Sequence, residues 1–122
     1  MTKVVLLIDD NPIDLMINEK TVLRFNPEIQ LYKASSGQLA LDMLSSGELL
    51  PNIILLDIKM PLMNGFEFLD ALETLSIEKN FAIHMLSSSI DPSDLKEAED
   101  REIVKSYIEK PISMDKLAKI FN

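Results

Sequence analysis

The sequence predicts an α/β protein with a doubly wound parallel sheet, in which five strands alternate with five helices. Three apolar runs, at 3–8, 53–56 and 81–86, lack the alternation of a half-exposed strand, as expected where helices cover both faces of a sheet. Segments with the apolar spacing of helices lie between the runs. Because the 122 residues contain no repeats or low-complexity stretches, we expect a single domain over residues 1–122.

The first half of the chain contributes three strands and two helices. The strand at 3–8 leads into a helix that Asn11 caps and Pro12 begins. The run at 29–32 is shorter and more polar, which suits an edge strand, and the run at 53–56 is a buried strand. The apolar residues expected to share a face are Ile13, Met16, Ile17 and Leu23 in the first helix, and Ala40, Met43 and Leu44 in the second.

The second half contributes three helices and two more strands, at 81–86 and 106–109, of which the latter suits an edge. The segment 91–105 reads as a helix that begins at a proline and has only a thin apolar stripe. We therefore expect it to be the least firmly packed helix. The residues expected to share a face are Phe68, Leu72 and Leu75 in the third helix, and Met114, Leu117, Ala118 and Phe121 in the last, which Ser113 caps.

Composition excludes several classes of protein. No apolar run approaches the roughly 18 to 20 residues of a membrane span, and the N-terminus lacks the pattern of a signal peptide, so we expect a cytoplasmic protein without a membrane partner. The absence of cysteine excludes disulfides, thiolate nucleophiles and cysteine zinc sites. A net charge of −8 without a Lys/Arg cluster argues against nucleic-acid binding.

Acidic residues end two of the predicted strands: Asp9 and Asp10 follow the first, and Asp57 ends the third. In a doubly wound sheet, ligands bind beyond the carboxyl ends of the strands, so these acids are expected to converge. Two like charges about 4 Å apart repel by roughly 4 kcal/mol at an effective dielectric constant of about 20, which a divalent cation such as Mg²⁺ would offset. The simpler interpretation is that Asp10 belongs to a helix cap and Asp57 to a turn.

Two further strand ends add a cation and hydroxyl groups. Lys110 follows the fifth strand and Ser87 to Ser89 follow the fourth. Taken singly, the lysine reads as a solvated loop charge and the serines as the start of a turn. Taken with the acids, they supply what transfer of a phosphoryl group to Asp57 requires: a carboxylate nucleophile, metal ligands, a positive charge and a hydroxyl donor.

The motifs "LLIDDNP", "LLDIKMPLMNGFEFL", "MLSSS" and "YIEKP" resemble, in this order, those of the receiver domain of two-component response regulators, the CheY-like family, and the resemblance covers essentially the whole chain. It implies a flavodoxin-like fold with strand order 2-1-3-4-5. It also implies that Asp57 is the phosphoacceptor, that Asp10 is the main metal-binding acid, and that Asp9 acts beside it, directly or through water.

The same resemblance assigns roles to five further residues. The backbone carbonyl of Lys59 would be the third protein contact, beside Asp10 and Asp57, to Mg²⁺ or Mn²⁺, and Ser87 and Lys110 would each bind a phosphoryl oxygen. Tyr107 matches the aromatic residue that turns inward when the hydroxyl residue moves towards the phosphoryl group. Gly65 matches a position whose backbone conformation a side chain would strain.

The resemblance implies a single-domain response regulator, active in a two-component or phosphorelay system. A sensor histidine kinase or histidine phosphotransfer protein would donate the phosphoryl group, and the surface of helix four, strand five and helix five would then bind an unknown target protein. We expect a signalling domain with at most slow self-dephosphorylation, not an enzyme. His84, inside a predicted strand, is expected to be a packed residue.

Three alternatives stay open. An adaptor could keep the fold without the phosphorylation switch. A haloacid-dehalogenase-like phosphatase would need a second acid two residues after the nucleophile, where this chain has Lys59. A flavodoxin-like FMN carrier would need a phosphate-binding loop after the first strand, where "DDNP" would repel a phosphate.

Overall fold

Five parallel strands form one sheet in the order β2-β1-β3-β4-β5. The computed structural model describes residues 3–89 and 91–121 of the chain. The predicted fold class and strand order are confirmed, and the two strands expected at the edges, β2 and β5, lie there. The strands are β1 (Val4–Ile8), β2 (Gln30–Ala34), β3 (Ile53–Asp57), β4 (Ala82–Ser87) and β5 (Val104–Glu109).

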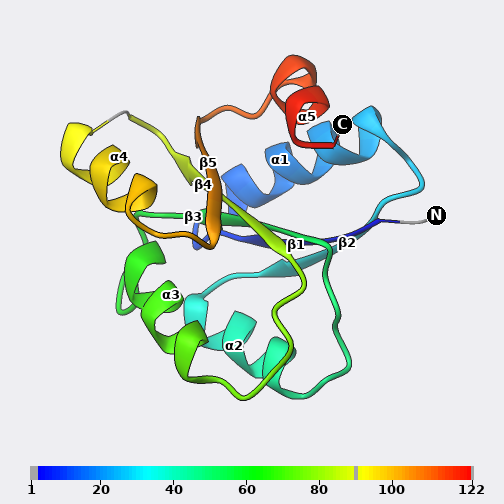
Figure 1. Ribbon diagram of the computed structural model, residues 1–122. Coiled ribbons are helices and arrows are strands. Elements are labelled where there is room, and N and C mark those ends of the chain that lie inside the picture. The colour runs from blue at the N-terminus through cyan, green and yellow to red at the C-terminus, as the bar shows by residue number, and fades with distance from the viewer. Residues whose placement is uncertain (1–2, 90, 122) are drawn as a thin grey trace.

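Helices cover both faces of the sheet (Figure 1). Successive residues of a strand point to opposite faces, so Val5 and Leu7 contribute to the core beneath α1 and α5, and Leu6 and Ile8 to the core beneath α2 and α3. This burial on both sides explains why the central strands are apolar without alternation. The helices are α1 (Pro12–Phe25), α2 (Gly37–Ser45), α3 (Gly65–Thr74), α4 (Pro92–Glu99) and α5 (Met114–Phe121). None of the helices in the described part of the chain is long and apolar enough to cross a membrane.

The register of the sheet brings the ends of the strands together. Ile8 pairs with Leu56, so Asp9 follows β1 at the level where Asp57 ends β3. Asp57 in turn pairs with Leu86, the residue before Ser87. The polar residues that end these strands therefore meet at one edge of the sheet, as a parallel arrangement requires.

The face of α1 that packs against the sheet differs from the predicted one. Asn11 caps the helix as expected, since its side chain accepts hydrogen bonds from the backbone of Ile13 and Asp14. However, the buried residues of α1 are Asn18 and Val22. Of the four apolar residues expected to share a face of this helix, only Leu23 packs against the core, whereas Ile13 is 61% exposed. Met16 and Ile17 are also exposed.

The apolar face that the spacing indicates is therefore not the face that α1 packs against the sheet. The first turns of α1 instead present apolar side chains to solvent, and a polar residue, Asn18, occupies the buried face. Apolarity alone cannot orient a helix that carries apolar residues on two faces, because contacts with β1, β2 and α5 fix its rotation about its own axis.

The segment predicted as one helix over 91–105 is divided. Helix α4 ends at Glu99, and a turn closed by the hydrogen bond from Val104 N to Arg101 O leads directly into β5. Strand β5 thus begins at Val104, two residues before the predicted start, because Val104 pairs with Ile83 of β4. As expected from its thin apolar stripe, α4 buries a single residue, Ala98.

His84 is a packed residue of β4, as predicted. Its ring is buried, and Nδ1 lies 2.6 Å from the hydroxyl oxygen of Ser106 on the neighbouring strand. Burial lowers the pKa of His84, and the charge of Lys105 lowers it further. The folded protein therefore favours the neutral imidazole.

We predict that His84 makes the fold less stable at low pH. In the unfolded chain the imidazole binds a proton near its ordinary pKa of about 6.5, whereas the folded state resists protonation until the pH is lower. The free energy of unfolding should therefore fall as the pH drops below about 6.5 and towards the lower folded pKa. Urea unfolding at pH 7.5 and 5.5 measures this, with His84→Asn as the matched variant. An equal loss of stability in both proteins would contradict the prediction.

Candidate functional site

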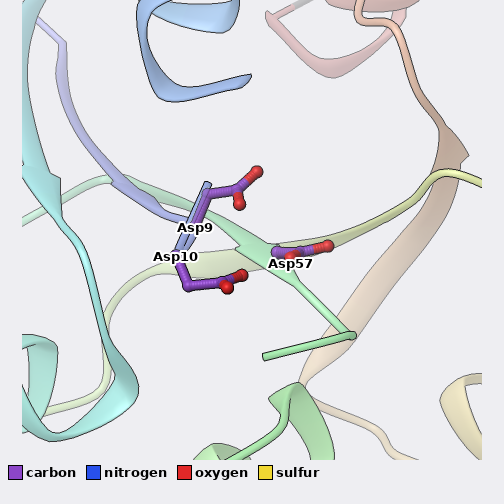
Figure 2. Close-up of side chains that lie close together, drawn as sticks. All are labelled: Asp9, Asp10 and Asp57. Atoms are coloured by element: carbon purple, nitrogen blue, oxygen red, sulfur yellow. The ribbon is translucent and has the colours of Figure 1, made fainter. Parts of the chain in front are cut away.

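Three carboxylates gather at the ends of β1 and β3. Asp57 is 4% exposed and Asp9 is fully buried, whereas Asp10 is exposed. One carboxylate oxygen from each residue lies within 4.8 Å of the other two. Figure 2 shows the three side chains beside one another above the two strand ends. The convergence predicted from the two acidic strand ends is therefore present.

Lys110 brings the positive charge to this cluster from the end of β5. Its Nζ lies 2.7 Å from Oδ2 of Asp9 and 3.2 Å from Oδ1 of Asp57. A third carboxylate, that of Asp14 in the first turn of α1, lies 3.1 Å from the same nitrogen. The ammonium is thus bound between residues that are far apart in the sequence.

The electrostatics of the site follow from burial and from these close charges. Burial raises the pKa of Asp57 to about 6, the negative charge of Asp9 adds to this, and Lys110 acts in the opposite direction. Burial by itself would lower the pKa of Lys110, but the hydrogen bond to Asp9 and the charges of Asp57 and Asp9 outweigh it and raise that pKa. Lys110 is therefore a permanent cation, while Asp57 is mostly a carboxylate at neutral pH.

The residues present fit a hard divalent cation. Three carboxylates contact the one ammonium and a fourth, that of Asp10, lies beside Asp9 and Asp57, so negative charge is in excess. Oxygen donors are the ligands that Mg²⁺ prefers. Asp9 already accepts a hydrogen bond from Asn11 N at one oxygen and from Lys110 at the other. Within the described part of the chain, no side chain hydrogen-bonds to Asp10. The carboxylate of Asp10 is thus less engaged than that of Asp9, and the metal-binding roles expected for the pair stay a prediction.

Lys59 lies in the loop after β3, and its side chain reaches the first turn of α4. Its Nζ is 3.9 Å from Oδ2 of Asp94, in the first turn of α4. This contact links the loop beside Asp57 to α4, a helix that buries a single residue. The metal contact expected from the backbone carbonyl of Lys59 stays a prediction.

Ser87 and Tyr107 share one hydrogen-bond acceptor. The buried hydroxyl of Ser87 donates to the carbonyl oxygen of Ser89 at 2.6 Å, and the phenol of Tyr107 donates to the same oxygen at 3.3 Å. Tyr107 packs, partly buried, against the core beneath α2 and α3. A rotation of the Ser87 hydroxyl towards Asp57 would therefore remove one of two donors from this carbonyl, which couples Ser87 to Tyr107.

Asp14 was missed by the sequence analysis. The signal was present in "DDNPID", because this acid lies in the first turn of the predicted helix, shortly after the acidic pair that ends the preceding strand. An acid at that position also has an ordinary explanation, since it interacts favourably with the helix dipole. Only the folded structure, which brings Lys110 to Asp14 from 96 residues away, shows that Asp14 belongs to the site and does not merely interact with the helix dipole.

Comparison with known proteins identifies the family. A family model described as the response regulator receiver domain matches residues 5–122. The chain belongs to this family. The resemblance inferred from the four motifs is confirmed.

Relatives of the receiver domain agree with this assignment. This chain is 31% identical over 117 residues to the sensor histidine kinase CheAY of Helicobacter pylori. The alignment covers 96% of this chain but only 14% of the kinase. The chain is 27% identical to sporulation initiation phosphotransferase F of Bacillus subtilis, covering 96% of this chain and 89% of that protein. The crystal structure of a two-component response regulator from Cytophaga hutchinsonii superimposes with a TM-score of 0.90 at 30% identity, covering 98% of this chain and 94% of that one.

Receiver domains are signalling domains of two-component systems and are generally not enzymes. Phosphorylation of an aspartate is a general property of the family, and receiver domains interact with histidine kinases or phosphotransfer proteins. They bind Mg²⁺ through acidic residues, and this chain has a cluster of three acids, Asp9, Asp10 and Asp57, at the ends of β1 and β3.

Gly65 of this receiver domain is constrained by space and not by a strained backbone, which corrects the expected reason. Gly65 is the first residue of α3, and among the described glycines only Gly47 has a positive φ. A Cβ at Gly65 would lie 2.8 Å from the carbonyl oxygen of Asp57 and 3.0 Å from Cα of Ile58. The helix therefore begins against the backbone that presents Asp57.

We predict that Gly65→Ala lowers the free energy of unfolding by about 1–3 kcal/mol, because the added methyl group meets backbone atoms that cannot move aside cheaply. Gly37→Ala is the matched control, since Gly37 is likewise the first residue of a helix but its Cβ would meet the flexible side chain of Met63. Urea denaturation compares the two variants with the wild type. A smaller loss for Gly65→Ala than for Gly37→Ala would show that the contact with Asp57 is unimportant.

Proposed function

We propose that residues 1–122 form one receiver domain that accepts a phosphoryl group on Asp57 from a histidine kinase or histidine phosphotransfer protein. The observation that carries this proposal is the buried Asp57 carboxylate with Lys110 Nζ at 3.2 Å and two more acids within metal-binding distance. We further propose that the domain is a cytoplasmic response regulator, with a protein as its target and no nucleic-acid or membrane partner.

In the proposed reaction, a carboxylate oxygen of Asp57 attacks the phosphorus of a phosphohistidine. The P–N bond breaks, its electron pair returns to the histidine nitrogen, and Asp57 becomes an acyl phosphate. A bound Mg²⁺, held by Asp10, Asp57 and the Lys59 carbonyl, would supply positive charge for the phosphoryl oxygens. Burial raises the pKa of Asp57 to about 6, which is still below neutral pH, so the nucleophile is mostly ionised there.

Lys110 and Ser87 would bind the phosphoryl oxygens after transfer. Lys110 is already in contact with Asp57, so its ammonium needs only a small adjustment to reach a group attached to that side chain. Ser87 follows the residue paired with Asp57, and its hydroxyl would leave the Ser89 carbonyl in order to donate to phosphate. These two contacts would convert a covalent change into a conformational one.

The proposed switch is a shift of population. Reversing a 1:99 preference between two conformations requires about 5.5 kcal/mol. A hydrogen bond to a charged group contributes about 1.5–3 kcal/mol, so Ser87 and Lys110 together come close to this amount and neither suffices alone. Loss of the Ser87 hydroxyl from the Ser89 carbonyl would alter the position of Tyr107 and, through it, the surface of α4, β5 and α5.

We predict that incubation with Mg²⁺ and acetyl phosphate adds one phosphoryl group to the protein. Asp57→Asn should abolish the adduct because an amide cannot act as the nucleophile, whereas Asp42→Asn, which removes an exposed acid of α2, should keep it. Intact-mass spectrometry measures both. Absence of an adduct in the wild type would favour the phosphorylation-independent adaptor. Turnover of many phosphate esters would favour a phosphatase.

We predict that Lys110→Ala still accepts a phosphoryl group but fails to switch, because the acyl phosphate loses its charged donor. Amide NMR spectra with and without phosphorylation should show large changes over α4, β5 and α5 in the wild type and much smaller ones in Lys110→Ala. Lys119→Ala, which removes an exposed lysine of α5, is the control and should switch normally. Equal changes in phosphorylated Lys110→Ala and wild type would contradict the coupling scheme.

A further inference from the structure

Lys110 has three carboxylate partners, and the proposed chemistry explains two of them. Asp57 is the proposed phosphoacceptor, and Asp9 belongs to the predicted metal-binding pair. The third partner, Asp14, lies one helical turn into α1, and its Oδ2 is 3.1 Å from Lys110 Nζ. Neither metal binding nor phosphoryl transfer requires Asp14 directly.

The number of partners matches the number of donors. A lysine ammonium has three N–H groups and no acceptor. Its neighbours in the site are one oxygen each of Asp9, Asp14 and Asp57, at 2.7, 3.1 and 3.2 Å. Two of these contacts, to Asp9 and Asp14, are hydrogen bonds, and the third, to Asp57, is an ion pair. The ammonium is largely withdrawn from water, since only 10% of the lysine side chain is exposed.

Asp14 is not needed to begin α1. The side chain of Asn11 already caps the helix by accepting from the backbone N–H groups of Ile13 and Asp14. The side chain of Asp14 is 37% exposed, so it could be solvated, yet one of its oxygens contacts the buried ammonium. Its orientation therefore follows from Lys110 and not from the helix cap.

We propose that Asp14 is a positioning residue that, together with Asp9, holds the Lys110 ammonium in place while Asp57 is phosphorylated. This inference rests on the proposed function of Asp57. When the carboxylate oxygen of Asp57 bonds to phosphorus and the P–N bond of the donor breaks, the carboxylate loses its charge and the phosphoryl group gains three acceptor oxygens. The N–H that pointed at Asp57 then turns to a phosphoryl oxygen, while the N–H groups bound to Asp9 and Asp14 keep their partners.

The first measurement is independent of phosphorylation. In ¹⁵N-labelled protein, the ammonium signal of Lys110 should exchange with water much more slowly than those of exposed lysines, because three carboxylates hold it. Asp14→Ala should lose this protection while the backbone spectrum shows an intact fold. Asp115→Ala is the matched control, since it removes an acid from the first turn of α5 in the same way and should leave the signal unchanged.

The second measurement is the rate at which acetyl phosphate adds the phosphoryl group, followed by intact mass. Asp14→Ala should slow this phosphorylation by about tenfold. That is the lower end of the loss of activity expected when a residue that orients a site side chain is removed. In a Lys110→Met background the same change should alter the rate by less than about twofold, since the residue to be positioned is gone.

The outcomes separate the two proposals. The positioning role is wrong if the Lys110 ammonium of the wild type exchanges with water as fast as exposed lysines do, or if Asp14→Ala leaves that exchange unchanged. It is also wrong if Asp14→Ala leaves the phosphorylation rate unchanged, or slows it as much in the Lys110→Met background. If the wild type accepts no phosphoryl group, the proposed function fails, while the exchange measurement still decides whether Asp14 holds Lys110.

Discussion

The contact between the Lys110 ammonium and the carboxylates of Asp9 and Asp57 is the interaction on which the rest of the site depends. Both acids are buried at the end of the central strands, where two unpaired negative charges would cost several kcal/mol. A lysine that arrives from the edge strand, 101 residues after Asp9 and 53 after Asp57, provides the compensating charge. Because acids outnumber the lysine, the site retains an attraction for a cation and, once that cation is bound, for a phosphoryl group.

The parallel sheet is what makes this contact possible. Strands that all run in one direction end at one edge, so residues that terminate β1, β3, β4 and β5 meet although the helices separate them in sequence. Burial on both faces holds the strands rigid, and Gly65 lets α3 begin close to the carbonyl of Asp57. The carboxylate is thereby fixed by backbone that cannot easily move.

The periphery of the site differs in character from its centre. Around Asp57 the contacts are short and charged, whereas Ser87 and Tyr107 share one carbonyl oxygen, that of Ser89. Helix α4 buries only Ala98, and polar contacts at both of its ends, from Lys59 to Asp94 and from Arg101 to Asp70 of α3, supplement this packing. The closely packed cluster around Asp57 is therefore joined, through Ser87 and Tyr107, to a more loosely packed surface, as the proposed switch requires.

The sequence by itself determined the fold class, the edge strands and the acids at the strand ends, because these depend on apolar runs and on residues next to them in the chain. Four features were decided by tertiary structure. Contacts with the sheet and α5 chose the buried side of α1, pairing with β4 began β5 at Val104, and close approach to Asp57 explains Gly65. The fourth is the link from Asp14 to Lys110, which exists only after the two ends of the chain meet. Local patterns record which residues a segment contains, whereas its rotation, its neighbours and the partner of each charge arise from packing.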